Sequence, residues 1–207
     1  MADELETFNS AHYWQRRYRQ GGTSGAGSYG QLADYKASYI NNIVDKYHIQ
    51  DVIEFGCGDG NQASLFDFPR YTGIDVSKLV VRACRQKFAD RPDWRFFPTG
   101  RPEIAPHDMA MSLDVIYHLI EDHIYDAYMH DLFANAKRFV LIYASDKDEP
   151  TKNKHVRDRQ FSNWVSREQP DWQLLDCPAH PFALVEGKSD KLHSFASFKL
   201  YATEVWK

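Results

Sequence analysis

Residues 54–60 read Glu-Phe-Gly-Cys-Gly-Asp-Gly, and they end the short, mostly apolar run 51–55 that is typical of a buried strand. Glycines at alternate positions after a strand permit a sharp turn with positive φ and place no Cβ between the backbone and a ligand. The next predicted strand ends at Asp75, 15 residues past Gly60, where a carboxylate can accept hydrogen bonds from a ribose diol. This order of strand, glycines, helix, strand and acid predicts a site for an adenosine-containing cofactor, although a glycine-rich turn before an aspartate can also be an ordinary loop.

On either side of this stretch, the sequence alternates between predicted strands and helices. We expect strands at 51–55, 71–74, 94–97, 109–113 and 138–143, and helices at 32–47, 61–68, 77–88 and 125–133. Residues 21–30 contain five glycines and predict a flexible loop. The tail from Trp172 is strand-like and predicts an antiparallel hairpin. The pattern therefore predicts an α/β fold with a doubly wound, mostly parallel sheet and an antiparallel C-terminal hairpin.

The composition narrows the class of protein. The chain has 207 residues, 43% of them apolar, and a net charge of −4, which suits one domain over 1–207 with an N-terminal region at residues 1–48 and a sheet core at 49–207. No apolar run approaches the roughly 18 residues of a membrane helix, and the first residues are acidic, so we expect a cytoplasmic protein. The negative charge makes a nucleic-acid partner a poor expectation. The three cysteines show no paired spacing, which predicts reduced thiols and no structural metal.

The glycine turn departs from the dinucleotide pattern. G-x-G-x-x-G starting at Gly56 requires glycine at 61, where this chain has Asn61. Glu54 and Asp59 would also place two carboxylates near a pyrophosphate. Acidic side chains suit instead the ammonium and sulfonium of S-adenosylmethionine. A nicotinamide-dependent oxidoreductase is therefore disfavoured.

With these residues in view, Val52–Gly60 resembles motif I of class I S-adenosylmethionine-dependent methyltransferases, and Tyr71–Asp75 resembles their motif II. The resemblance implies a seven-stranded Rossmann-like sheet and S-adenosylmethionine as cofactor. It further implies that Glu54 holds the methionine amino group and that Gly56 and Gly58 line the cofactor. Asp75 would bind the ribose, and Val76 and Leu79 would flank the adenine. Many members place an acid just after strand three to bind the adenine amino group, but here Pro98-Thr99-Gly100 follows Phe97.

The N-terminal residues 13–18 resemble a segment that some small-molecule methyltransferases fold over the methionine end of the cofactor. In that case Tyr13 and Trp14 close over the methionine, and Arg17 pairs with its carboxylate. The glycine loop 21–30 would then be a hinge that orders on binding. The alternative is that these aromatic residues only pack a surface helix onto the sheet.

Candidate residues for the acceptor follow strands four and five, because ligands of doubly wound sheets lie outside the carboxyl ends of the strands. Asp114, His118 and Asp122 are spaced four apart and share one face if the segment is helical. His118 is the first choice for a general base beside Asp114, although it could instead only hydrogen-bond Asp114 or cap the turn. His155 and Arg157 lie in a basic run that suits an anionic acceptor.

A magnesium site is a weaker hypothesis. Asp114 and Asp146 follow strands four and five, as in catechol-type methyltransferases, but Lys147 stands where a third ligand would be. No metal is therefore predicted.

The sequence as a whole predicts methyl transfer from S-adenosylmethionine to a small acceptor. Stretches 14–36 and 114–132 look similar to methyltransferases associated with surface-polysaccharide assembly, which implies a sugar hydroxyl or a phosphate-linked group as acceptor. The alternatives are a cofactor-binding protein without transferase activity and a metal-dependent O-methyltransferase. The oligomeric state is left open.

Overall fold

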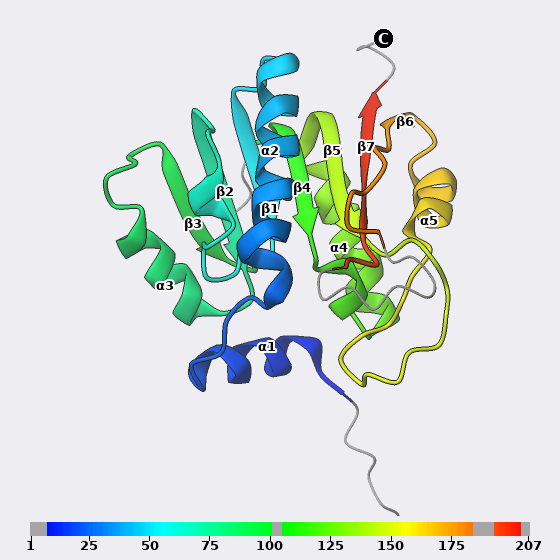
Figure 1. Ribbon diagram of the computed structural model, residues 1–207, viewed down its shortest axis with the longest axis horizontal. Coiled ribbons are helices and arrows are strands. Elements are labelled where there is room, and N and C mark those ends of the chain that lie inside the picture. The colour runs from blue at the N-terminus through cyan, green and yellow to red at the C-terminus, as the bar shows by residue number, and fades with distance from the viewer. Residues whose placement is uncertain (1–7, 101–104, 184–192, 204–207) are drawn as a thin grey trace, which may run out of the picture.

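The strands form one mixed sheet in the computed structural model, which describes residues 8–100, 105–183 and 193–203. The strand order is β3-β2-β1-β4-β5-β7-β6; β1 to β5 are parallel, whereas β7 is antiparallel to both of its neighbours (Figure 1). The seven strands are β1 (Asp51–Phe55), β2 (Arg70–Asp75), β3 (Trp94–Pro98), β4 (His107–Leu113), β5 (Ala136–Ala144), β6 (Trp172–Asp176) and β7 (Ser197–Thr203). This confirms the predicted α/β sheet and its antiparallel C-terminal strands.

Helices cover both faces of the sheet, and one helix covers an end. The α-helices are α1 (Ser10–Arg19), α2 (Gly30–Lys46), α3 (Lys78–Lys87), α4 (Asp122–Ala134) and α5 (Phe161–Glu168). Residues of α2 and α3 share one hydrophobic cluster with the sheet, and residues of α4 and α5 share the other. Helix α1 lies across the carboxyl ends of the parallel strands (Figure 1). None of the described helices has the length and apolar character needed to cross a bilayer.

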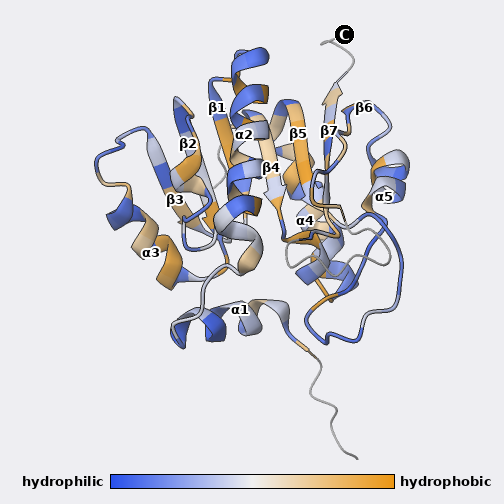
Figure 2. Cartoon of the chain, viewed as in Figure 1, coloured by the Kyte–Doolittle hydropathy of each residue, from blue (hydrophilic) through white to orange (hydrophobic). Residues whose placement is uncertain are grey.

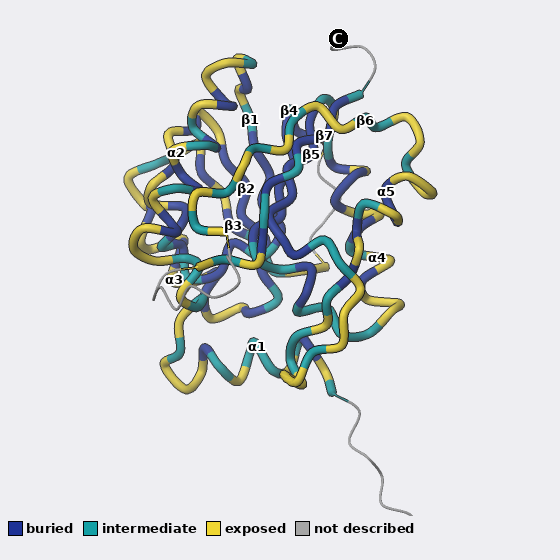
Figure 3. The backbone as a smooth tube through the Cα atoms, turned by 45° about the vertical axis from the view of Figure 1, so that its right-hand side comes forward, coloured by how far each residue is buried: buried dark blue, intermediate teal, exposed yellow. Residues whose placement is uncertain are grey.

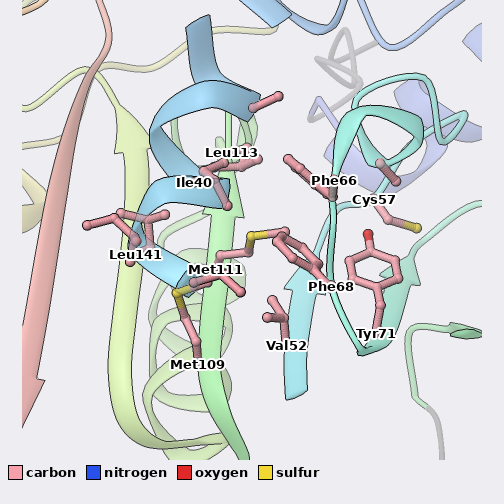
Figure 4. Close-up of a cluster of buried hydrophobic side chains, with 14 of the residues drawn as sticks. Ile40, Val52, Cys57, Phe66, Phe68, Tyr71, Met109, Met111, Leu113 and Leu141 are labelled. Atoms are coloured by element: carbon pink, nitrogen blue, oxygen red, sulfur yellow. The ribbon is translucent and has the colours of Figure 1, made fainter. Parts of the chain in front are cut away.

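The core explains why the central strands read as apolar runs. Val52, Met109, Met111 and Leu141 are buried and face Ile40 of α2 across the α2 side of the sheet (Figure 4). The hydropathy and burial of the chain agree, with apolar and buried residues concentrated in the strands (Figures 2 and 3). Parallel strands that are covered on both faces need such continuous apolar sequences.

One expected helix, and one segment whose helical character was left conditional, differ from a continuous helix in the structure. Residues 61–68 contain only a 3-10 turn, η2 (Ala63–Leu65). The Ser64 hydroxyl donates to the carbonyl of Asn61, which competes with a continuing helix. Residues 114–122 do not form one helix either, because Asp114 has φ +58 and only Ile116–His118 form the 3-10 turn η3 before α4 begins. Asp122 therefore does not share a helical face with His118.

Two side chains also depart from their expected positions. Lys36 of α2 is a charged residue of a type that is usually exposed, yet it is fully buried. Leu79, which the resemblance places beside the adenine, is 50% exposed. The neighbouring Val80, Val81 and Cys84 form the buried face of α3, and Leu79 lies outside that face.

Candidate active site

The glycine turn after β1 closes tightly against its neighbours. Gly56 has φ +87, and a Cβ there would lie 2.4 Å from Val115 Cγ2. Gly58 has φ +57 and donates its N–H to Asp75 Oδ2 at 3.0 Å. Side chains at these positions would both strain the backbone and fill the space above the turn. The turn therefore leaves bare backbone at the carboxyl end of β1.

Asp75 ties the end of β2 to this turn. Its Oδ2 accepts from Gly58 N–H, and its Oδ1 accepts from Ser77 N–H at 2.8 Å. Ser77 is the N-cap residue of α3 but makes no side-chain cap bond, so the aspartate supplies the local acceptor. Burial raises the pKa of Asp75 to about 6, while these two N–H groups lower it.

Glu54 is a buried carboxylate that faces the same space. Tyr71 donates its hydroxyl to Oε2, whereas Oε1 has no hydrogen bond within the described part of the chain. Burial raises the pKa of Glu54 to about 7, and the Tyr71 hydroxyl and the Lys36 charge lower it. A cationic ligand beside Oε1 would stabilise the ionised form.

Asp114 is held at the end of β4 by a buried lysine. Lys36 Nζ lies 2.6 Å from Asp114 Oδ2, and Tyr117 donates its hydroxyl to Oδ1 at 2.8 Å. The carboxylate thus compensates a lysine that would otherwise be an unpaired buried charge. The same contacts hold Asp114 in its left-handed conformation, which few residues other than glycine adopt.

His118 has a defined tautomer. Its Nδ1 lies 2.8 Å from the carbonyl of His155; because a carbonyl only accepts, Nδ1 carries the proton and Nε2 is the basic nitrogen. Nε2 makes no hydrogen bond to any described residue. The Trp14 ring stands edge to face with His118, with the centroids 4.9 Å apart. Burial lowers the pKa of His118 to about 4, so the ring is neutral at pH 7.

The glycine loop is docked onto the glycine turn through Asp59. Asp59 Oδ2 accepts from Ser24 N–H and from the Tyr29 hydroxyl, each at 2.8 Å, and Asp59 N–H donates to Ser24 Oγ. Asn61 donates to the carbonyl of Ser28 at 2.7 Å. Within the loop, Ala26–Ser28 form the 3-10 turn η1. Asp59 thus holds the loop and does not line the ligand space, contrary to its expected place beside the cofactor.

A cavity of about 330 Å³ joins these elements at the carboxyl ends of β1, β2 and β4. This volume falls within the usual range of small-molecule sites, about 300–1,000 Å³. The sequence-predicted residues that line it are Trp14, Glu54, Gly56, Gly58, Asp75, Val76, Asp114 and His118. Thr99 and Gly100 after β3 line it as well, and so does Asp131 of α4.

Four expected site residues do not line the cavity: Tyr13, Arg17, Leu79 and His155. Tyr13 stacks on His155, with the ring centroids 4.9 Å apart, and His155 in turn stacks on His118. Arg17 donates from Nε to the carbonyl of Thr23 at 2.7 Å, and so holds the start of the glycine loop. Tyr13, Arg17 and His155 therefore support the walls of the cavity from outside.

The basic run and the metal pair have other partners. Arg157 and Arg159 both pair with Asp122, and both donate to the carbonyl of Ile120. Asp146 pairs with Lys199 at 2.5 Å, so it does not form a shared ligand set with the lysine-bound Asp114. The described residues contain no group of three potential metal ligands.

Lys36 and Tyr18 are among the site residues that sequence reasoning missed. Lys36 lies behind Asp114, and Tyr18 lines the cavity beside Gly58, with its hydroxyl 3.1 Å from Ser24 Oγ. The burial of Lys36 could have been inferred from its spacing, because it lies one turn after Leu32 and one turn before Ile40, on the apolar face of α2.

Sequence comparison with known proteins finds a partial match to a methyltransferase. No protein-family model matches the sequence. A stretch of 97 residues is 34% identical to the eEF1A lysine and N-terminal methyltransferase of Danio rerio, and it covers 44% of this chain and 13% of that protein. The chain thus spans only a small fraction of that relative.

Solved structures match over nearly the whole chain. The magnesium protoporphyrin IX methyltransferase of Synechocystis PCC 6803, solved with S-adenosylmethionine, has a TM-score of 0.65 at 12% identity and covers 96% of this chain and 99% of its own. The 1,6-didemethyltoxoflavin-N1-methyltransferase of Burkholderia thailandensis, solved with S-adenosylhomocysteine, has a TM-score of 0.65 at 16% identity, covering 93% and 86%. The methyltransferase domain of bacterial CtHen1-C has a TM-score of 0.63 at 19% identity, covering 84% and 99%. The chain has the Rossmann-like fold of class I S-adenosylmethionine-dependent methyltransferases.

Proposed function

We propose that this chain, as a single domain, is a methyltransferase that takes its methyl group from S-adenosylmethionine and passes it to a small acceptor. The observation that carries the proposal is one cavity at the switch point between β1 and β4 that joins Glu54, the glycine turn and Asp75. Ligands of doubly wound sheets bind at this point.

The residues present fit the cofactor at three places. Glu54 has one oxygen without a hydrogen-bond partner among the described residues in a buried setting, which suits an ammonium group. The bare backbone at Gly56 and Gly58 admits an extended ligand. Asp75 can accept from a ribose diol with the lone pairs that Gly58 and Ser77 leave free. Thr99 and Gly100 then lie where the adenine would be, in place of the acid that the resemblance to class I methyltransferases implies after strand three.

When bound, the cofactor supplies an electrophilic methyl group on a sulfonium. His118 is the base in this proposal, because it lines the cavity and its unprotonated Nε2, which makes no hydrogen bond to a described residue, can take a proton from an acceptor hydroxyl or amine. The carbonyl of His155 fixes the tautomer, and Trp14 packs against the ring. Helix α1 and the glycine loop cover the strand ends and exclude water from the reacting groups.

The acceptor remains a prediction. The prediction of a sugar hydroxyl as acceptor rests on the resemblance to methyltransferases of polysaccharide assembly. The similar proteins reported above are instead named for magnesium protoporphyrin IX, 1,6-didemethyltoxoflavin, and a protein lysine and N-terminus. A metal-dependent reaction is not favoured, since Lys36 and Lys199 separately occupy the two candidate carboxylates.

Calorimetry tests the cofactor. S-adenosylhomocysteine should bind and NAD should not, and Asp75→Ala should weaken binding by about 1.5–3 kcal/mol, the range for hydrogen bonds to a charged group. Asp67→Ala removes an exposed aspartate from the same β1–β2 connection and should leave the affinity unchanged. Equal affinity for wild type and Asp75→Ala would overturn the assignment. Binding without methyl transfer to any acceptor would support the alternative of a cofactor-binding protein.

A further inference from the structure

The charge of the cavity restricts what can enter it. Four carboxylates line it, those of Glu54, Asp75, Asp114 and Asp131, and no lysine or arginine side chain does so among residues 8–100, 105–183 and 193–203. Lys36 compensates one of these carboxylates from behind. Glu54 and Asp75 are assigned above to the cofactor, whose ammonium and sulfonium are positive. Arg17 lies outside this lining, with its guanidinium carbon 5.6 Å from the centroid of the Trp14 ring, and the resemblance described above reserves it for the carboxylate of the cofactor. The remaining lining offers a second anion no compensating side chain.

The cations of the basic run are already bound to other groups of the protein. Arg157 Nη1 lies 2.9 Å from Asp122 Oδ1 and donates to the carbonyl of Ile120. Arg159 is buried, and its guanidinium donates to the carbonyls of Leu119 and Ile120 as well as to Asp122. These side chains hold the backbone just after His118 and do not reach the acceptor. The basic run therefore has a structural role and does not support the expected anionic acceptor.

The acceptor end of the cavity is defined by four residues, which we call the His118 wall: Ser10, Trp14, His118 and Leu119. Ser10 joins α1 to this wall by accepting from Ile120 N–H at 3.1 Å and donating to Glu121. Trp14 and His118 present rings, and Leu119 presents an apolar side chain. The imidazole carries no charge, so the four side chains of the wall are uncharged; two are aromatic, one is aliphatic, and the Ser10 hydroxyl is already bonded to Ile120 and Glu121.

We propose that the acceptor binds the His118 wall through a planar, uncharged group that carries an N–H or O–H, and that carboxylates and phosphates are rejected there. The inference rests on the proposed methyltransferase function. In the transfer, a bond forms between the acceptor N or O and the methyl carbon while the sulfur–methyl bond breaks. The electron pair of the broken bond stays on sulfur, and the acceptor proton passes to His118 Nε2. An uncharged ring packs against Trp14, and its donor group meets the basic nitrogen that the wall offers.

A matched pair of small molecules tests this. Indole-3-ethanol and indole-3-acetate share a ring and a chain length but differ in charge. With the protein saturated by S-adenosylhomocysteine, each is titrated while the ring signals of His118 are followed by NMR. We expect indole-3-ethanol to bind at least about tenfold more tightly. Equal or tighter binding of indole-3-acetate, or no response of His118 to either compound, would overturn the proposal.

Two variants sharpen the result. Leu119→Lys places a cation in the wall and should narrow or reverse the preference between the two compounds. Leu174→Lys adds the same charge on the exposed strand β6, where Leu174 is 52% exposed, and should leave the preference unchanged. An unchanged preference in Leu119→Lys would contradict the charge argument. Calorimetry with S-adenosylhomocysteine alone separates this inference from the proposed function. If S-adenosylhomocysteine does not bind, the proposed function fails. If it binds but indole-3-acetate is preferred over indole-3-ethanol, only this inference fails.

Discussion

The two ends of the cavity are built in different ways. The glycine-turn end uses Gly56, Gly58 and Asp75, which lie within 20 residues of one another, and Asp75 is held by backbone N–H groups of the turns that directly follow β1 and β2. The His118 wall joins α1, η3 and the segment before α5, so its contacts connect residues 37 to 111 positions apart. The first end is therefore set by the fold, and the second by how peripheral segments pack on it.

Their electrostatics differ as well. Burial raises the pKa of both Glu54 and Asp75 at the first end and lowers that of His118 at the second. In each case burial disfavours the charged form. A cationic ligand can restore the charge of the carboxylates, whereas a neutral imidazole is already in the form that a base requires. Under the proposed function, the first end therefore takes the charged cofactor and the His118 wall takes the proton.

The largest expected effect is a loss of turnover when His118 is replaced, and it distinguishes the His118 wall from the glycine-turn end. His118→Ala should lower turnover by about 10²- to 10⁴-fold, the usual range for a lost general base, while the affinity for S-adenosylhomocysteine stays within about twofold. His123→Ala, an exposed histidine in α4, is the control. Steady-state kinetics and calorimetry measure the two quantities. Full turnover in His118→Ala would mean that the wall supplies no base.

The buried ion pair lies between the two ends, and its loss should affect folding. Lys36→Met leaves the Asp114 carboxylate partly buried without its partner, which should lower the free energy of unfolding by about 3–5 kcal/mol. Lys46→Met changes an exposed lysine of the same helix and should cost less than about 0.5 kcal/mol. Urea unfolding checks both values. Adding Asp114→Asn to Lys36→Met should recover some of the loss, and a further loss would contradict the pairing.

Asp59 connects the glycine loop to the first end. Asp59→Asn weakens the bonds from Ser24 N–H and Tyr29, so amide exchange at 24–29 should accelerate by about 10- to 150-fold, equivalent to about 1.5–3 kcal/mol. S-adenosylhomocysteine should slow exchange across 13–30 in the wild type. Asp67→Asn is the matched control. If Asp59→Asn exchanges at the wild-type rate, other contacts hold the loop.

The smallest expected effect is a pH dependence of the affinity for S-adenosylhomocysteine, which arises from Glu54 at the glycine-turn end. Glu54 has a pKa of about 7 in the folded protein against an ordinary value of 4.5, so it becomes protonated as the pH falls through 7. Affinity for S-adenosylhomocysteine should then fall by up to about tenfold per pH unit below 7, and Glu54→Gln should flatten the curve. In the free protein the same shift makes folding stability decrease as the pH rises from about 4.5 to about 7. Calorimetry at pH 8, 7 and 6 measures the first effect, and a flat wild-type curve would contradict it.

The first end could be predicted from sequence, and the second could be predicted only in part. A glycine turn and a strand-end acid act through backbone geometry, so their spacing in sequence fixes their place in space. His118 was found because it follows β4, but its partners Trp14 and His155 come from segments whose packing no local pattern encodes. A lysine in a helical pattern is usually exposed, and only Asp114 across the fold accounts for the burial of Lys36.

The long-range contacts of Ser10 also bear on the order in which the protein folds. The bond from Gly58 to Asp75 closes a loop of 17 positions, whereas the bonds from Ser10 to Glu121 close one of 111. Longer loops cost more entropy to close, and contacts of this kind form late in folding. We therefore expect a refolding chain to acquire the cofactor end before the His118 wall, so that a folding intermediate binds S-adenosylhomocysteine before it can hold an acceptor.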